Sequence, residues 1–222
     1  MSRQQFAGAV KTSTSLISPL ERRMATLVVP KIPSWLETHH LTWLTLLWCA
    51  LIVGFGFLAA GDIRWLWLVS LMVIFQYLTD FFDGKVGKYR NTGLVKWGFY
   101  TDHFLDYVFL CSMLTAYAMI LPESSRYHLF FLLAVYAGFM VHSFLAFAAT
   151  GKFNISHLKM GPTEFRVAII VINTLLIIFG TKKMIVALPY VAAGSLVALC
   201  VLVYTTQKEI WRIDKEKLDG AD

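Results

Sequence analysis

Residues 78–106 read LTDFFDGKVGKYRNTGLVKWGFYTDHFLD, and this stretch places four aspartates at the facing ends of two long apolar segments. Asp80 and Asp83 lie at the end of the first segment, and Asp102 and Asp106 lie at the start of the second. An ionised carboxylate near hydrocarbon is costly unless it is paired or binds a cation. Four carboxylates also repel one another, so a divalent metal ion is the expected partner of this group.

Helical spacing is expected to bring the four carboxylates together. Asp80 and Asp83 are three residues apart, and Asp102 and Asp106 are four apart, so each pair shares one helical face. Two neighbouring antiparallel helices can then aim both pairs at one small volume near one membrane surface. The alternative is a set of separate acids that reach out to water or pair with a loop lysine. Two pairs in register at one depth argue against that alternative.

Glycines and basic residues follow the first pair of acids. Gly84 and Gly87 lack a Cβ and would let a ligand approach the backbone. Lys85, Lys88 and Arg90 lie beside them. This combination suits a pyrophosphate, because a metal ion bridges its oxygens and the basic side chains neutralise the remaining charge.

The composition is that of a membrane protein. Of the 222 residues, 57% are hydrophobic and 15% are charged, and the mean hydropathy is +0.61. The net charge of +6 does not indicate nucleic-acid binding, because the basic residues lie between apolar runs and form no stripe. The three cysteines lie singly in apolar runs and are expected to be small core residues. We therefore expect one membrane domain over residues 1–222.

Six apolar segments are long enough, or nearly so, to cross a bilayer as helices. They cover about 41–60, 63–82, 99–121, 129–150, 165–180 and 184–205. Before them, Ser18 and Pro19 favour a helix start, so we expect an amphipathic surface helix over about 18–36. Residues 206–222 are expected to form a charged cytosolic tail that is partly helical. The predicted fold is all-α: six transmembrane helices with an N-terminal surface helix on the cytosolic side.

The basic residues predict the orientation. Sixteen of the 20 Lys and Arg residues fall in the N-terminal arm, the second and fourth connections and the C-terminal tail. With six spans these segments share one side, and the positive-inside rule places that side in the cytosol. We expect an integral multi-pass protein with both termini in the cytosol, in a bacterial inner membrane rather than in the endoplasmic reticulum.

The pattern resembles the signature of the CDP-alcohol phosphotransferase family, D-x-x-D-G-x-x-A-R-(x)n-G-x-x-x-D-x-x-x-D. The matching residues are Asp80, Asp83, Gly84, Gly98, Asp102 and Asp106. Gly87 stands where the family has Ala, Lys88 stands where it has Arg, and the loop is slightly longer. Lysine keeps the charge but lacks the two-pronged guanidinium, and Arg90 is the candidate to take over that contact.

The resemblance implies a metal site and a nucleotide site. Asp80, Asp83, Asp102 and Asp106 would hold one or two Mg²⁺ or Mn²⁺ ions, and Asp106 would also be the general base on an acceptor hydroxyl. The residues expected at the nucleotide are Thr79, Asp83, Gly84, Gly87, Lys88, Arg90 and Gly98.

The implied reaction is phospholipid synthesis. An alcohol attacks the β-phosphorus of a CDP-linked donor and CMP is released. Either the donor is CDP-diacylglycerol and the acceptor a small polar alcohol, or the donor is a CDP-amino alcohol and the acceptor diacylglycerol. The expected partners are these substrates, the lipid bilayer and a second copy of the chain, and nucleic acid is not among them.

A second group of residues borders the start of the fifth apolar segment. His157, Lys159, Glu164 and Arg166 are candidates to contact the acceptor or a phosphate. An ordinary helix start is equally compatible with Glu164, and a solvated loop with His157 and Lys159. Asn173, in the middle of that segment, is expected to form a hydrogen bond between helices.

Two other functions remain as alternatives. A divalent-cation transporter would also use intramembrane acids, but it needs polar groups that continue through the bilayer. The outer halves of the second and third segments offer only Ser70, Gln76, Ser112 and Thr115. A non-catalytic relative of the family is the other alternative, because of the changes at Gly87 and Lys88.

Overall fold

The computed structural model describes residues 18–92, 94–151 and 162–219. Within these ranges the regular structure is helical and no strand occurs. The elements are α1 (Ser18–Val28), η2 (Val29–Lys31), α2 (Thr38–Ala59), η3 (Ile63–Trp65), α3 (Leu66–Arg90), α4 (Val95–Ile120), η4 (Glu123–Ser125), α5 (Arg126–Thr150), α6 (Pro162–Phe179) and α7 (Lys182–Asp219).

The prediction of an all-α membrane bundle is confirmed. Five helical stretches of the described chain are long and apolar enough to cross a membrane: α2, α3 with η3, α4, α5 with η4, and α7. The 18-residue helix α6 stands where the sequence predicts the fifth of six spans. Large apolar side chains cover the outside of the bundle, among them Phe130, which is 73% exposed, and Val197, which is 62% exposed. These surfaces are suited to contact with lipid.

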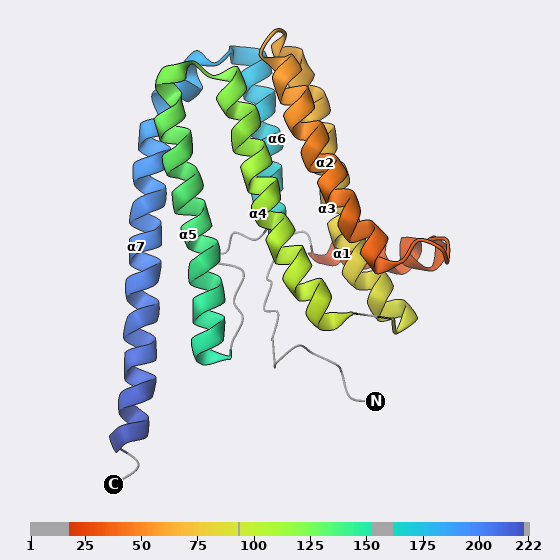
Figure 1. Cartoon of the computed structure of the whole chain (residues 1–222), viewed down its shortest axis with the longest axis vertical. Helices are drawn as coiled ribbons and strands as arrows, with labels where there is room; N and C mark the ends of the chain where they lie inside the picture. Colours follow the sequence, from red (N-terminus) through yellow and green to blue (C-terminus); the bar gives the residue numbers. More distant parts are fainter. Residues whose placement is uncertain (1–17, 93, 152–161, 220–222) are drawn as a thin grey trace.

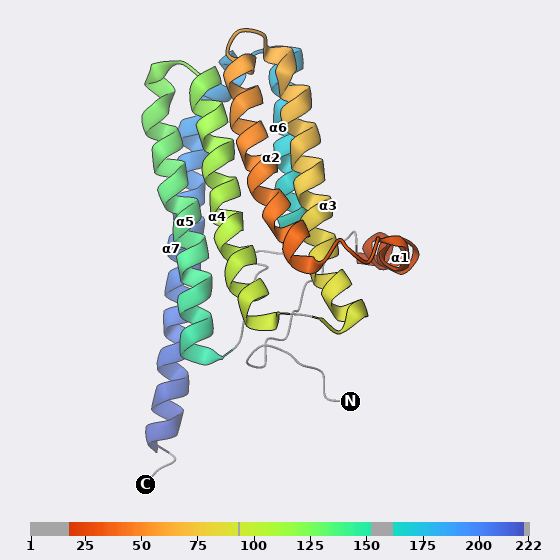
Figure 2. The ribbon, with the colours of Figure 1, turned by 45° about the vertical axis from the view of Figure 1, so that its right-hand side comes forward.

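The helices form two groups that meet along α4 (Figure 1). In the first, α2 packs on both α3 and α4, and α6 packs on α3. In the second, α5 packs on α7 and also reaches α4. Helix α1 lies crosswise to the bundle at one end. In Figure 2 it is seen almost end-on. We call this end the α1 end and the opposite one the far end.

The structure corrects the prediction of a basic loop after Asp83. Helix α3 continues through Gly84 and Gly87 to Arg90, and only a short turn separates it from α4. Burial explains the continuation, because Val86 is fully buried against Val29 and Leu41. The helix ends at Asn91, whose φ of 56° is left-handed and whose N–H donates to the Gly87 carbonyl.

The two ends of the described chain can be compared with the prediction. The surface helix is shorter than expected, because α1 ends at Val28 and Pro30 and Pro33 follow. The C-terminal segment is a helical extension of the last span, as predicted, and α7 continues as one helix to Asp219. An i, i+4 ion pair between Arg212 and Glu216 (3.5 Å) lies in this extension.

The core lies where α2, α3 and α4 meet. Gly56 of α2 lies so close to Ala116 of α4 that an added Cβ would come within 2.5 Å of the Ala116 Cβ and 2.8 Å of its Cα. The absence of a side chain at Gly56 therefore sets how closely the two helices pack. This contact lies toward the far end of α4, ten residues after Asp106.

Candidate functional site

The four aspartates lie on two neighbouring helices. Asp80 and Asp83 belong to α3, and Asp102 and Asp106 belong to α4. Asp83 is buried, with 8% of its surface exposed, while the side chains of Asp80 and Asp106 are 22% and 33% exposed. Asp102 lies close enough to the other three to interact with each of them electrostatically. The two acidic pairs therefore share one volume, which is partly open to the outside of the bundle.

Arg166 of α6 joins the two helices through a single nitrogen atom. Its Nη2 lies 2.9 Å from Asp80 Oδ2 and 3.4 Å from Asp106 Oδ1. One positively charged point thus touches carboxylates from both α3 and α4. Arg166 is 4% exposed, and its Nε donates to Gln76 Oε1 at 2.6 Å. A buried guanidinium with three partners is held in place rather than left to move freely.

Asn173 fixes α6 in register with the same two helices. It lies two turns after Arg166, and it is fully buried. Its amide nitrogen donates to Ser70 of α3 at 3.0 Å, and its amide oxygen accepts from the hydroxyl of Tyr117 of α4 at 2.8 Å. The predicted hydrogen bond between helices is therefore present. Together, Arg166 and Asn173 place α6 against α3 and α4 at two heights.

Asp83 is oriented by α2. Its Oδ2 accepts a hydrogen bond from the hydroxyl of Thr42 at 3.0 Å, and its Oδ1 accepts from the backbone N–H of Gly84. The Thr38 hydroxyl donates to the Asp83 carbonyl at 3.2 Å. The N-terminal turns of α2 thus lie over the end of the acidic cluster. We did not identify Thr38 or Thr42 from the sequence, although polar residues at positions 38, 42 and 45 of an apolar span give a signal at helical spacing.

The acidic cluster fits a divalent cation in charge and in the kind of donor. Four carboxylates face one guanidinium, so negative charge remains, and Mg²⁺ and Mn²⁺ prefer oxygen ligands. As the side chains lie, no group of three His, Cys, Asp or Glu residues within the described ranges is arranged to hold a metal ion. One carboxylate oxygen each of Asp80 and Asp106 forms an ion pair with Arg166, and one oxygen of Asp83 accepts a hydrogen bond from Thr42. A divalent ion at this position would require these side chains to rotate toward a common centre.

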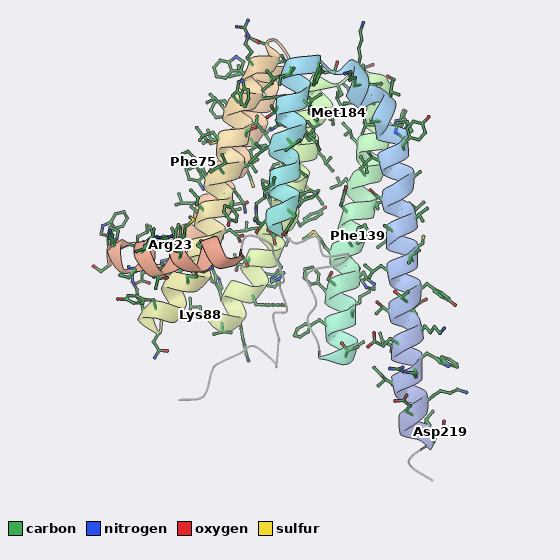
Figure 3. The ribbon with its side chains drawn as sticks, turned by 180° about the vertical axis from the view of Figure 1, so that it is seen from behind. Arg23, Phe75, Lys88, Phe139, Met184 and Asp219 are labelled. Atoms are coloured by element: carbon green, nitrogen blue, oxygen red, sulfur yellow. The ribbon has the colours of Figure 1, made fainter. Side chains whose placement is uncertain are left out.

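The predicted nucleotide residues differ in their surroundings. A Cβ on Gly84 or Gly98 would meet no other atom within 4 Å, so the space beside both is open. Lys88 is exposed at the α1 end of α3, where Figure 3 labels it. Gly87, in contrast, is buried. The Thr79 hydroxyl donates to the carbonyls of Phe75 and Gln76 in its own helix, at 3.0 and 3.1 Å.

Arg90 lies away from the acids in this structure. Its guanidinium donates to four backbone carbonyls of the segment between η2 and α2, namely those of Ile32, Pro33, Ser34 and Leu36, at 2.8 to 3.4 Å. Arg90 therefore fastens the segment that leads from α1 into α2. A nucleotide contact from Arg90 stays a prediction, and it would require the guanidinium to exchange some of these carbonyl partners.

The predicted acceptor residues divide into two groups. Glu164 is half-buried in the first turn of α6, and Arg166 follows it within the cluster. The sequence counts Arg166 with the basic residues of the fourth connection on the cytosolic side, but the structure buries it inside the bundle. His157 and Lys159 lie outside the described residues. Sequence reasoning missed Gln76 as a site residue, although it precedes Asp80 by one helical turn and shares its face.

Comparison with known proteins agrees with this arrangement. A model of the CDP-alcohol phosphatidyltransferase family matches residues 39–206, which include all four aspartates and Arg166. No curated protein and no solved structure gave a match.

Proposed function

Because the chain belongs to the CDP-alcohol phosphatidyltransferase family, we propose that its four aspartates form the active site for transfer of a substituted phosphate group from a CDP-linked donor to an alcohol. Family membership makes the chain an integral membrane protein of phospholipid synthesis. One observation supports the proposed site most directly: a single atom, Arg166 Nη2, contacts carboxylates of both α3 and α4. A cation at that point is within reach of both helices.

In the proposed reaction an alcohol oxygen forms a bond to the β-phosphorus of the donor. The bond from that phosphorus to the bridging oxygen breaks, and CMP leaves with the α-phosphate. Asp80, Asp83, Asp102 and Asp106 would hold one or two Mg²⁺ or Mn²⁺ ions, which supply positive charge for the phosphate oxygens when bound. Lys88 is exposed beside the cluster and would add charge from the side of the nucleotide.

Asp106 is the candidate general base. Its side chain is one of the more exposed in the cluster, and a base must come within hydrogen-bonding distance of the hydroxyl whose proton it takes. In the present arrangement Asp106 Oδ1 accepts from Arg166 at 3.4 Å. The Asp106 carboxylate is the group proposed to receive the proton.

We propose that one substrate carries diacylglycerol and stays in the bilayer while the nucleotide reaches the cluster from the cytosolic side. The α1 end is then the cytosolic end, as the basic residues predict. Either the CDP group or the acceptor hydroxyl belongs to the lipid, and the two cases share one site. The two substrate series described below distinguish these cases.

The experiment is CMP release by the purified chain in detergent, with CDP-diacylglycerol plus polar alcohols in one series and with CDP-choline or CDP-ethanolamine plus diacylglycerol in the other. Each series is run with Mn²⁺, with Mg²⁺ and with a chelator. We expect metal-dependent CMP release in one series, which then identifies the lipid-bearing partner. No release in either series would contradict the proposed function and would favour a transporter or a non-catalytic relative.

The substitution Asp106→Asn tests the role of the base. We expect CMP release to fall at least about 100-fold, which is the lower end of what general-base catalysis contributes. Binding of the CDP donor, measured by isothermal titration calorimetry in the presence of Mn²⁺, should remain nearly unchanged. An equal loss of binding and turnover would assign Asp106 to the donor site instead of to proton transfer.

A further inference from the structure

One face of α3 contacts the chain where it enters α2. Asp83, Val86 and Arg90 share this face, because they are three and four residues apart in one helix. We call residues 32–37, which join η2 to α2, the entry segment. Figure 2 shows the start of α2 beside the end of α3, at the α1 end of the bundle. Asp83 and Arg90 therefore hold neighbouring parts of the same stretch of chain.

Arg90 binds the entry segment with both of its terminal nitrogens. Nη2 donates to the carbonyls of Ile32 and Pro33, at 2.8 and 2.9 Å. Nη1 donates to those of Leu36 and Ser34, at 2.8 and 3.4 Å. A guanidinium can make all four contacts because it is planar and its donors are fixed in two directions, whereas a lysine has a single nitrogen. The contacts fix the orientation of the entry segment as well as its distance from α3.

The entry segment leads within a few residues to the groups that hold Asp83. Its last residue, Glu37, is the N-cap of α2. The cap is reciprocal: the Glu37 side chain accepts from the backbone N–H of His40, and His40 Nδ1 accepts from the Glu37 N–H at 3.2 Å. Thr38 and Thr42 follow in the first two turns and donate to the carbonyl and to Oδ2 of Asp83. A shift of the entry segment would therefore move both donors.

Apolar packing alone gives this region little directional support. Val86 is fully buried against Val29 and Leu41, and these three residues form a small cluster that is separate from the main core. Burial of apolar surface is not directional, so it holds α2 near α3 without fixing how α2 is turned about its own axis. Hydrogen bonds depend on angle as well as distance, and the contacts of Arg90 supply this constraint.

We propose, on the basis of the proposed function, that Arg90 is a positioning residue for the divalent-cation site. Arg90 holds the entry segment, the entry segment fixes the first turns of α2, and Thr42 then fixes the direction of the Asp83 carboxylate. Arg90 acts through α2 in this role and not by contact with the ion. Groups that orient metal ligands strongly affect metal affinity, so loss of Arg90 weakens the binding of the cation.

The test is a double-mutant cycle on the Mn²⁺ affinity of the full-length protein in detergent, measured by isothermal titration calorimetry without nucleotide. Arg90→Ala, Thr42→Val and the double variant are compared with the unchanged protein. Arg64→Ala is the matched control, because Arg64 is an exposed arginine at the opposite end of the same helical stretch. Arg90→Lys replaces Arg90→Ala if the latter does not fold, since it keeps the charge but loses the two-pronged guanidinium.

We expect the change at Arg90 to weaken Mn²⁺ binding by at least about fivefold when Thr42 is present, and by less than about twofold when Thr42→Val is already in place. Arg64→Ala should leave the affinity nearly unchanged. The sign is informative, because loss of a positive charge alone would strengthen the binding of a cation. Without nucleotide in the titration, a lost nucleotide contact cannot produce the effect. Unchanged or tighter binding, or an equal loss with and without Thr42, would overturn the proposal.

CMP release by the same samples separates this proposal from the proposed function. We expect Arg90→Ala to raise the Mn²⁺ concentration that gives half-maximal CMP release and to change the rate at saturating Mn²⁺ little, whereas a loss of folded protein would lower that rate alone. Coupled loss of Mn²⁺ affinity without CMP release would keep the positioning role and reject the reaction. CMP release with no coupling between Arg90 and Thr42 would reject the positioning role alone. Absence of Mn²⁺ binding by the unchanged protein would overturn both.

Discussion

Arg166 is the residue that joins the acids of α3 and α4. Its guanidinium is almost fully buried, and it contacts Asp80 and Asp106 at once. A buried ion pair adds little net stability compared with an apolar pair, but removal of one partner leaves an uncompensated charge. Arg166 therefore acts as a built-in counter-ion where a bound cation is also expected, and the two should substitute for one another in part.

Replacement Arg166→Met tests this substitution. We expect the free energy of unfolding to fall by about 3–5 kcal/mol without metal, because the carboxylates lose a buried partner. Added Mn²⁺ should then raise the midpoint of thermal unfolding in detergent more for the variant than for the unchanged protein. Arg126→Met is the matched control, since the Arg126–Glu123 pair is exposed and worth at most about 1 kcal/mol. Identical Mn²⁺ shifts in both proteins would show that Arg166 and the metal do not share the site.

Thr42 controls the direction of Asp83. Its hydroxyl donates to the buried carboxylate, and hydrogen bonds to charged groups contribute roughly 1.5–3 kcal/mol. We expect Thr42→Val to lower Mn²⁺ affinity by about tenfold or more, measured by calorimetric titration. Thr45→Val is the control, because Thr45 is buried one turn further along α2. Equal effects of the two changes would mean that the Mn²⁺ affinity responds to any lost hydroxyl of α2, and not to the lost hydrogen bond between Thr42 and Asp83.

At the scale of the elements, the contact of Gly56 with Ala116 sets how closely α2 and α4 pack. Gly56→Ala would force a Cβ against the Ala116 backbone, and overpacking of this kind costs about 1–3 kcal/mol. Gly54→Ala, two residues earlier, meets no atom within 4 Å and should raise stability by about 0.5–1 kcal/mol through helix propensity. Thermal unfolding of both variants checks this prediction. Similar unfolding midpoints for the two variants would indicate that α2 and α4 can move apart to accept the extra methyl group without losing stability.

The helices and the faces of the acidic pairs could be predicted from the sequence. Apolar segments of the length of a membrane predict the helices, and the spacing of Asp80 and Asp83, and of Asp102 and Asp106, predicts that each pair shares a face. These features are local. The helical continuation past Gly84 was missed because it depends on Val86, whose burial against Val29 and Leu41 outweighs the two glycines.

The rest of the site depends on contacts between distant helices. Arg166 looks like a cytosolic basic residue in the sequence, since it begins an apolar segment. Its burial follows from Gln76 and the acids, which lie at least 60 residues away along the chain. The four backbone carbonyls that Arg90 contacts lie more than 50 residues earlier in the chain, and the sequence did not predict them either. Periodicity alone cannot predict such pairings, because it does not say which helices are neighbours.

At the scale of the whole molecule, the two ends of the bundle differ in chemistry. The acids, the exposed Lys88 and the crosswise α1 gather at one end, as Figures 1 and 2 show for the helices. The rest of the bundle is apolar on its outside, where large side chains such as Phe130 and Val197 are exposed. A family of phospholipid synthesis meets both kinds of chemistry, because the head group and the chains of a lipid have opposite solvent preferences.

The central claim is that the acids of α3 and α4 bind one divalent-cation centre jointly. Titration of the purified protein with Mn²⁺, followed by the electron paramagnetic resonance signal of the free ion, measures this directly. We predict saturable binding of one or two ions, with at least tenfold weaker binding in Asp80→Asn of α3 and in Asp102→Asn of α4. Absence of saturable binding, or a loss confined to the variant on one helix, would contradict the claim.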